Sequence, residues 1–242
     1  MKALVVSDIH SNLEALTAVI DDAGRNGGFD EMWALGDLVG YGPDPAACIA
    51  LLQQHGARCV AGNHDLAASG MMGVEMFNDY AAAAAMWTTG QLEESDTAYL
   101  RELPLQMEMH GFTAVHGSPR DPVWEYVVNS VSALAAFEDI GTPRCLVGHS
   151  HVPFVCRLVD GVPAFRLATT GPVEVGDGRA IVNPGSVGQP RDGDPRASYA
   201  VYDSEAATVT HHRVEYDIPA TQRKMHERGL PEYLAERLTY GR

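Results

Sequence analysis

The chain has 242 residues, of which 45% are hydrophobic and 20% charged, and its formal net charge at pH 7 is −15. A chain of this length can bury a large core, either as one α/β domain or as two small domains. The acidic excess argues against an extended nucleic-acid-binding surface, because phosphate contacts need clustered Lys and Arg. It does not exclude a phosphate-bearing substrate, since bound divalent cations can reverse the sign of the charge inside one cleft.

No apolar run approaches the roughly 18 residues of a membrane-spanning helix. The first eight residues turn polar too quickly for a signal peptide. We therefore expect a cytoplasmic protein without a membrane partner. The four cysteines form no C-x-x-C pair and have apolar neighbours. This predicts buried, reduced thiols rather than a zinc site or a disulfide framework.

The N-terminal region predicts three strand-loop-helix units. Residues 2–7 form an apolar run typical of a buried strand, and Asn12 is placed to cap the helix that follows. A second strand is predicted at 32–35, a second helix opens at Asp44–Pro45, and a third strand is predicted at 58–61. Such units form a parallel sheet whose loops gather at the carboxyl ends of its strands, where ligand sites lie.

Residues 66–103 are rich in Ala and Met, and we expect helices at about 75–90 and 95–102. They form either a cap over the site or ordinary helical packing. Another helix is predicted from Ser130 or Ser132 to about Ile140.

The second half of the chain is mostly β, and its C-terminal tail is helical. Nine strands are predicted, at 105–109, 112–115, 145–147, 152–159, 162–167, 173–175, 180–182, 199–202 and 208–212. Asp160–Gly161 predicts a hairpin turn, and the tail is helical from Pro219 with a break near 229–231. Because no repeat or linker is evident, we expect one domain over residues 1–242, with two packed sheets and helices outside.

Five apolar runs end in side chains that bind metals. They supply two carboxylates, one amide and four imidazoles: Asp8, His10, Asp37, Asn63, His116, His149 and His151. Two adjacent ions need a shared ligand, and a carboxylate can bridge them. The mixture suits manganese, iron, zinc, nickel or cobalt, whereas magnesium or calcium would prefer more carboxylates. We therefore predict a site for two divalent transition-metal ions.

The charge balance of such a site favours hydrolysis. Two ions bring about four positive charges and two carboxylates remove two, which leaves a surplus of roughly +2. That surplus can stabilise a bridging hydroxide and still attract a phosphate. The neutral amide of Asn63 preserves it.

The order of these motifs resembles that of the calcineurin-like metallophosphoesterases. The motifs are D-x-H at Asp8, G-D at Gly36, G-N-H-D at Gly62, H-G at His116 and G-H-x-H at Gly148. The stretch from Asn183 to Arg191 is similar to the bacterial phosphodiesterase-like branch. The resemblance implies an α/β fold with two mixed β-sheets packed as a sandwich and flanked by helices.

The resemblance also implies residue roles. One ion would take Asp8, His10 and His151, the other would take Asn63, His116 and His149, and Asp37 would bridge them. A metal-bridging hydroxide would attack phosphorus in line. His64 would face the substrate and protonate the leaving oxygen. Asp65, where the family more often has Glu, would bond to that imidazole and keep it cationic.

One difference from the motifs of this superfamily bears on the substrate class. Phosphoprotein phosphatases of this superfamily carry G-D-x-V-D-R-G, whereas residues 36–42 contain no Arg. This favours phosphodiesters of small molecules or nucleotides. A phosphomonoesterase, a phosphoprotein phosphatase and a non-catalytic binding scaffold remain alternatives, although scaffold relatives tend to lose ligands or the leaving-group His. The sequence leaves the oligomeric state open.

Other polar and aromatic residues have weaker predictions. Tyr41 lines the substrate cleft or is an ordinary loop aromatic, and Arg191 contacts a phosphate or orders the Gly-rich loop around it. Arg120 and Asp121 form an ion pair beside the site. The remaining histidines are expected to be surface or packing residues: His55, His110, His211, His212 and His226.

Overall fold

Two mixed β-sheets, each of six strands, face one another in the computed structural model, which describes residues 1–167, 171–176 and 178–242. The first sheet has the order β3 (Arg58–Cys59), β2 (Glu31–Ala34), β1 (Lys2–Val6), β11 (Ala197–Asp203), β12 (Thr208–Val214) and β9 (Pro172–Glu174). The second has the order β4 (Gln106–Met109), β5 (Phe112–Val115), β6 (Arg144–Leu146), β10 (Ala180–Asn183), β7 (Phe154–Val159) and β8 (Val162–Leu167). The predicted pair of mixed sheets is confirmed.

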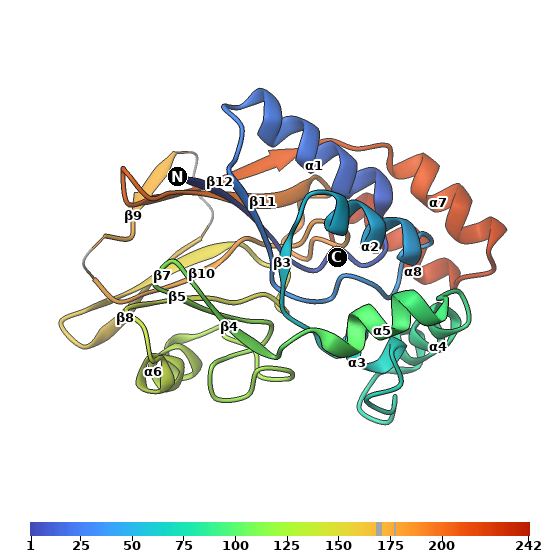
Figure 1. Cartoon of the computed structure of the whole chain (residues 1–242), viewed down its shortest axis with the longest axis horizontal. Coiled ribbons are helices and arrows are strands. Elements are labelled where there is room, and N and C mark those ends of the chain that lie inside the picture. Colours follow the sequence, from blue (N-terminus) through green and yellow to red (C-terminus); the bar gives the residue numbers. More distant parts are fainter. Residues whose placement is uncertain (168–170, 177) are drawn as a thin grey trace.

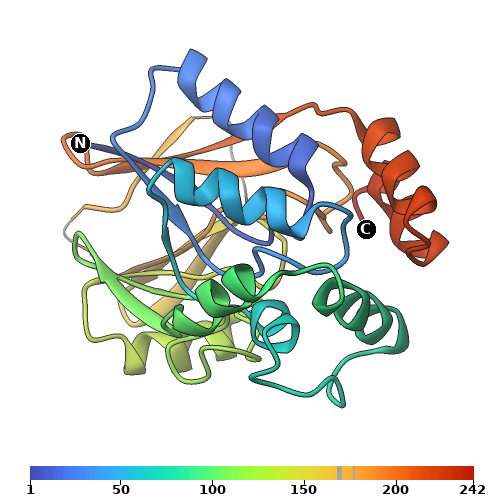
Figure 2. The ribbon, with the colours of Figure 1, turned by 45° about the vertical axis from the view of Figure 1, so that its right-hand side comes forward.

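Helices lie around this sandwich (Figure 1). They are α1 (Leu13–Arg25), α2 (Pro45–Gln54), α3 (Asn63–Ala68), α4 (Asp79–Thr89), α5 (Glu94–Glu102), α6 (Ser130–Asp139), α7 (Ile218–Glu227), α8 (Glu232–Glu236) and the short 3₁₀ helix η1 (Arg237–Tyr240). Helices α1 and α2 lie outside the first sheet and α6 lies outside the second (Figure 1). Helices α3, α4 and α5 gather at one end of the sandwich, as the turned view in Figure 2 shows.

Alternation along the strands builds these layers. In β1, Leu4 and Val6 pack with α1 and α2, whereas Ala3 and Val5 face the core between the two sheets. Because successive side chains of a strand point to opposite faces, one apolar strand can serve two cores. A third core joins α6 to the outer face of the second sheet.

The three N-terminal units form the predicted parallel arrangement. β1 pairs in parallel with β2, and β2 pairs in parallel with β3. β11 pairs antiparallel with β1 on its other side, which makes the sheet mixed. The loops after β1, β2 and β3 therefore open at one edge, where the predicted ligands are located.

Most predicted helix boundaries agree with the structure. The Asn12 side chain accepts a hydrogen bond from the Ala15 N–H at 3.1 Å and caps α1. The helix predicted at 75–90 begins later, at Asp79, because Asn78 caps it. Helix α3 was not predicted, since the G-N-H-D segment was expected to be a loop. Its six residues are too few to show a helical apolar repeat, and a carboxylate at its third position closes the first turn.

Two predictions from composition can also be compared with the structure. Among the described residues, no helix is both long and apolar enough to cross a membrane. All four cysteines are buried and free, as expected.

Candidate metal centre and active site

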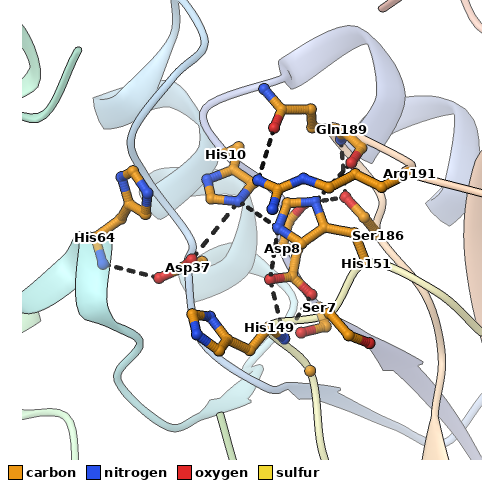
Figure 3. A network of polar contacts seen from close by, with 12 residues as sticks. Ser7, Asp8, His10, Asp37, His64, His149, His151, Ser186, Gln189 and Arg191 are labelled. Atoms are coloured by element: carbon orange, nitrogen blue, oxygen red, sulfur yellow. Dashed lines mark hydrogen bonds and ion pairs between the residues drawn. The ribbon is translucent and has the colours of Figure 1, made fainter. Parts of the chain in front are cut away.

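The loops at the carboxyl edges of both sheets bring the seven predicted ligands to one place. Each of the seven is at most 4% exposed: Asp8, His10, Asp37, Asn63, His116, His149 and His151. Figure 3 shows Asp8, His10, Asp37, His149 and His151 pointing toward a common centre. Residues more than 140 positions apart thus meet, as the sequence predicted for the ends of its strands.

The first group of donors consists of Asp8, His10 and His151. The Nε2 atoms of His10 and His151 are 3.3 Å apart, and His151 Nε2 lies 3.3 Å from Asp8 Oδ1. The ligand atoms of all three residues lie within 4.8 Å of one another, so the group could hold one metal ion.

The second group is centred on His116. Its Nε2 atom lies 3.2 Å from Asn63 Oδ1, 3.0 Å from His149 Nδ1 and 3.3 Å from Asp37 Oδ2. Asp37, His116 and His149 form a second set of donors that could hold an ion. The amide oxygen of Asn63 adds a fourth donor within reach.

Asp37 lies between the two groups. Its Oδ2 atom is 3.3 Å from His116 Nε2 and 3.6 Å from His10 Nε2. Its Oδ1 atom accepts the backbone N–H of His64 at 2.9 Å, which fixes the orientation of the carboxylate. One oxygen of Asp37 therefore faces both groups of donors.

Backbone carbonyls set the tautomers of three imidazoles. The Nδ1 atoms of His10, His116 and His151 bond to the carbonyls of Val39 (3.2 Å), Leu35 (2.8 Å) and Gln189 (2.6 Å), respectively. Because a carbonyl only accepts, each Nδ1 carries the proton and a neutral ring keeps its Nε2 lone pair. Those lone pairs point at one another and at carboxylates. Such crowding is unfavourable without a cation, so the donor set fits metal ions.

The pKa values of the clustered carboxylates and imidazoles also indicate that the cluster favours a bound cation. Burial raises the pKa of Asp8 to about 7. Burial opposes the charged forms of both Asp37 and His116, yet their mutual attraction holds the pKa of Asp37 well below its ordinary value. The same contact raises the pKa of His116 to about 9. In the protein alone, a proton on His116 thus supplies charge that a metal ion would otherwise bring.

Backbone strain is concentrated in these loops. Five of the predicted ligands have positive φ values between 48° and 63°: Asp8, His10, Asp37, His149 and His151. For residues other than glycine, such conformations cost on the order of 1–3 kcal/mol each. The surrounding contacts therefore hold each loop in an unfavourable conformation that turns its side chain inward.

Two glycines allow the loops to approach one another. A Cβ on Gly62 would lie 2.2 Å from Asp37 Oδ1, and a Cβ on Gly40 would lie 2.4 Å from His64 Nδ1. Gly40 also has a φ of +90°, which side chains rarely adopt. Neither position can carry a side chain without displacing a residue of the cluster.

Residues 183–191 form a loop that packs against the Asp8 loop of the first donor group. The Ser186 hydroxyl and the Gly188 N–H both donate to the carbonyl of Asp8, at 2.8 and 3.0 Å. A Cβ on Gly188 would lie 1.9 Å from the Ile9 carbonyl oxygen. The small residues of this loop therefore let its backbone lie directly against the Asp8 loop.

His64 is buried beside Asp37, and among the described residues its Nδ1 atom has no hydrogen-bond partner. Burial lowers the pKa of this imidazole to about 4. The predicted contact with Asp65 is wrong. The Asp65 carboxylate instead accepts three backbone N–H groups, from Leu38 at 2.9 Å, Val39 at 3.1 Å and Gly62 at 2.9 Å. Asp65 thus joins the start of α3 to the loop after β2.

A small pocket of about 90 Å³ opens over the second group and Asp37, and Tyr41, His64 and Arg191 line it. The Tyr41 ring lies 4.4 Å from the His64 ring and 4.6 Å from the His10 ring, between centroids. The Arg191 guanidinium lies 5.9 Å from the Tyr41 ring centroid and donates to Gln189 Oε1 at 2.9 Å. Tyr41 and Arg191 therefore both line this pocket, and Arg191 also bonds within the loop of residues 183–191. Substrate contact by either residue stays a prediction.

Sequence analysis missed three aromatic residues that line the same pocket: Phe77, Trp124 and Tyr126. The available signal was the W-x-Y spacing shortly after His116. The ion pair predicted nearby is also wrong, because Arg120 pairs with Glu125 and not with Asp121. Asp121 Oδ1 instead accepts the N–H groups of Val123 and Trp124, both at 3.1 Å.

A family model described as a calcineurin-like phosphoesterase superfamily domain matches residues 1–207. The chain belongs to the calcineurin-like phosphoesterase superfamily. The match includes all seven predicted ligands, His64 and the supporting loop at 183–191. Helices α7 and α8 lie beyond it.

The chain is also similar to individual proteins. A crystal structure of a metallophosphoesterase from Sphaerobacter thermophilus is 47% identical, with a TM-score of 0.91 and coverage of 100% of this chain and 99% of that chain. The uncharacterized protein MJ0912 of Methanocaldococcus jannaschii is 39% identical over 98% of this chain and 97% of its own length. A symmetrical bis(5'-nucleosyl)-tetraphosphatase of Glaesserella parasuis is 28% identical over 67% of this chain, which spans 59% of that protein.

Proposed function

We propose that this superfamily member is a dinuclear metal-dependent phosphoesterase that hydrolyses phosphodiesters of small molecules or nucleotides. The observation that carries the proposal is the position of Asp37 Oδ2, within 3.6 Å of an imidazole nitrogen of each donor group. A single carboxylate oxygen shared between two sets of donors is what a pair of adjacent ions requires.

Two sets of side chains would hold the ions. Asp8, His10 and His151 would hold one ion, Asn63, His116 and His149 would hold the other, and Asp37 would contact both. Manganese, iron, zinc, nickel or cobalt suits this mixture of oxygen and nitrogen donors. When bound, such ions supply a water nucleophile at neutral pH and neutralise charge on the phosphoryl group.

The protein's own residues would bind and orient the ester. The Arg191 guanidinium lines the pocket and, among the described residues, has no carboxylate partner within 4 Å. It is therefore available to bind a phosphoryl oxygen. His64, on the same pocket, would donate a proton to the leaving oxygen.

The size of the pocket favours a small substrate. A volume of about 90 Å³ is well below the roughly 300–1,000 Å³ of pockets that enclose whole ligands, so only a phosphoryl group would be enclosed. Residues 36–42 lack the phosphate-binding Arg of phosphoprotein phosphatases. The relationship to a tetraphosphatase makes nucleotides a reasonable class to test.

The helical segment at 66–103 would act as a cap in this proposal. Met76, Phe77, Asn78 and Ala81 of this segment line the pocket beside His64. A binding scaffold is less favoured, because the complete donor set and His64 lie together. A cytoplasmic location and a single domain over residues 1–242 remain predictions.

The direct test uses purified protein depleted of metal by chelation and then loaded with manganese. The loaded protein should hydrolyse bis(p-nitrophenyl) phosphate and contain two manganese ions per chain by elemental analysis. The depleted protein should be inactive and should recover on readdition of metal. Equal turnover with and without metal would contradict the proposal.

A further inference from the structure

One wall of the pocket is aromatic. The donors of the second group form its polar side, and Phe77, Trp124 and Tyr126 line it together with Met76. These four residues, here called the aromatic rim, come from the segment before α4 and from the segment between β5 and α6. None of the four is needed to hold a metal ion.

Tyr126 lies directly on a predicted metal ligand. Its ring stacks on the His149 imidazole, with centroids 3.9 Å apart and planes 15° apart. The residue is nevertheless 45% exposed. A ring that is stacked on the floor of the site and still reaches solvent is placed to continue the stack with a further flat group.

Trp124 and Phe77 extend this surface to His64. Phe77 meets Trp124 edge to face at 5.3 Å and meets the His64 imidazole edge to face at 4.8 Å. Trp124 in turn lies 6.3 Å from the His149 ring. The aromatic contacts therefore run from the residue proposed to protonate the leaving oxygen to a ligand of the second group.

Polar contacts hold part of the rim in place. The Asp121 carboxylate accepts the N–H of Trp124 at 3.1 Å, and Glu125 accepts hydrogen bonds from Ser118 and Arg120. These contacts order the backbone that carries Trp124 and Tyr126, so less conformational entropy is lost when this segment binds a ligand. Met76, which is 74% exposed, adds a flexible and polarizable side chain.

We propose that the aromatic rim binds the flat ring of the substrate, specifically the base of a nucleoside phosphoester. This inference rests on the proposed function, because it needs a phosphoryl group bound at the metal centre. The pocket encloses little more than that group, so the rest of the substrate must lie along the rim. In a chain with a net charge of −15, an apolar aromatic surface suits an uncharged planar group.

The test compares adenosine 5'-monophosphate, which carries an adenine base, with ribose 5-phosphate, which carries none. Calorimetric titration of the manganese-loaded protein should show that the nucleotide binds about ten-fold tighter or more, as expected for stacking of one base. Trp124→Ala and Tyr126→Ala should bring that ratio close to one. Tyr126→Phe should keep it, because stacking does not need the hydroxyl.

Tyr80→Ala is the matched control. Tyr80 is also an exposed aromatic residue of the helical segment, but it stacks on Tyr233 and does not line the pocket. This variant should keep the wild-type ratio, and all variants should keep their manganese content. The rim subsite alone would be overturned if the wild type bound both compounds with equal affinity. It would also be overturned if Trp124→Ala and Tyr126→Ala both kept the wild-type preference for the nucleotide. If neither compound binds, the rim subsite is overturned, whereas the proposed function is decided separately by turnover of bis(p-nitrophenyl) phosphate.

Discussion

Two regions with buried histidine differ in what surrounds the imidazole rings. In the donor cluster, His10, His116 and His151 each bond a backbone carbonyl through Nδ1 and direct Nε2 at other donors. On β12, His211 is only 9% exposed and bonds the Asn183 carbonyl at 2.8 Å, but among the described residues it joins no group able to hold a metal. These histidines of both regions are therefore buried and hydrogen-bonded to a backbone carbonyl. Convergence of lone pairs distinguishes a candidate metal site from a packed imidazole.

The largest effect should come from removing the charge shared by the two groups. Asp37→Asn keeps the shape of the side chain but loses the carboxylate near both His10 and His116. We expect activity to fall by more than about 100-fold, the upper end of the cost of losing one supporting contact around a metal. Metal content should fall with it. Steady-state kinetics and elemental analysis measure the two effects.

The matched control for this substitution is Asp44→Asn. Asp44 is also a buried carboxylate, but it pairs with Lys224 and Arg228 at the C-terminal helices. This variant should keep its metal and its turnover. A similar loss of activity in both variants would mean that Asp37 acts through general stability.

His64→Ala should separate chemistry from metal binding. His64 lines the pocket and hydrogen-bonds Asp37 through its backbone N–H, which alanine keeps. Its imidazole also lies within 4.8 Å of the ligand atoms of His10 and Asp37, so metal content must be measured together with turnover. Turnover should fall by about 10²–10⁴-fold, the usual contribution of a general acid. Two ions per chain should remain bound. Loss of an ion from this variant would instead identify His64 as a ligand.

Gly62→Ala should perturb Asp37 without changing any donor. The added Cβ would lie 2.2 Å from Asp37 Oδ1 and 2.4 Å from its backbone nitrogen, so the carboxylate must shift. We expect a loss of about 10- to 100-fold in metal affinity or turnover. Gly141→Ala is the control, because a Cβ there meets nothing within 4 Å. Wild-type metal affinity and turnover in Gly62→Ala would show that the loops are less closely packed than described.

These residues also show what the sequence could predict. Asp8, Asp37 and His116 follow apolar strands, so their type and position together predict a cluster at one sheet edge. The order of the strands within each sheet could not be predicted. For example, β11 lies beside β1 because residues about 200 positions apart in the chain pair with one another. Such non-local pairing leaves no periodic signal in either strand.

The errors near the site have a common cause. The resemblance implied a contact between Asp65 and the His64 imidazole, but three backbone N–H groups occupy the Asp65 carboxylate. Tyr126 was missed because its segment has no regular apolar period, and its partner His149 is distant in the chain. Which groups a short polar or aromatic side chain contacts depends on how loops meet, and this follows from tertiary packing.

The last predicted effect concerns the packed imidazole and changes stability, with no change expected in metal content. Burial lowers the pKa of His211 to about 4, whereas an unfolded chain titrates near 6.5. Between these values the unfolded state binds more protons, so His211 lowers the free energy of unfolding as the pH falls from about 6.5 to about 4. The slope is about 1.4 kcal/mol per pH unit. His211→Gln keeps a donor for the Asn183 carbonyl and removes this titration.

Urea unfolding of the two proteins at several pH values should therefore show a stability difference that grows in favour of His211→Gln below pH 6.5 and is constant above it. The other buried histidines titrate in both proteins, so their contribution cancels in the difference as long as the sites are independent. A pH-independent difference would mean that His211 is already protonated, or exposed, in the folded protein. In that case His211 would titrate like a histidine on the surface. Only the residues around each ring, and not burial, would then be compared between His211 and the histidines of the donor cluster.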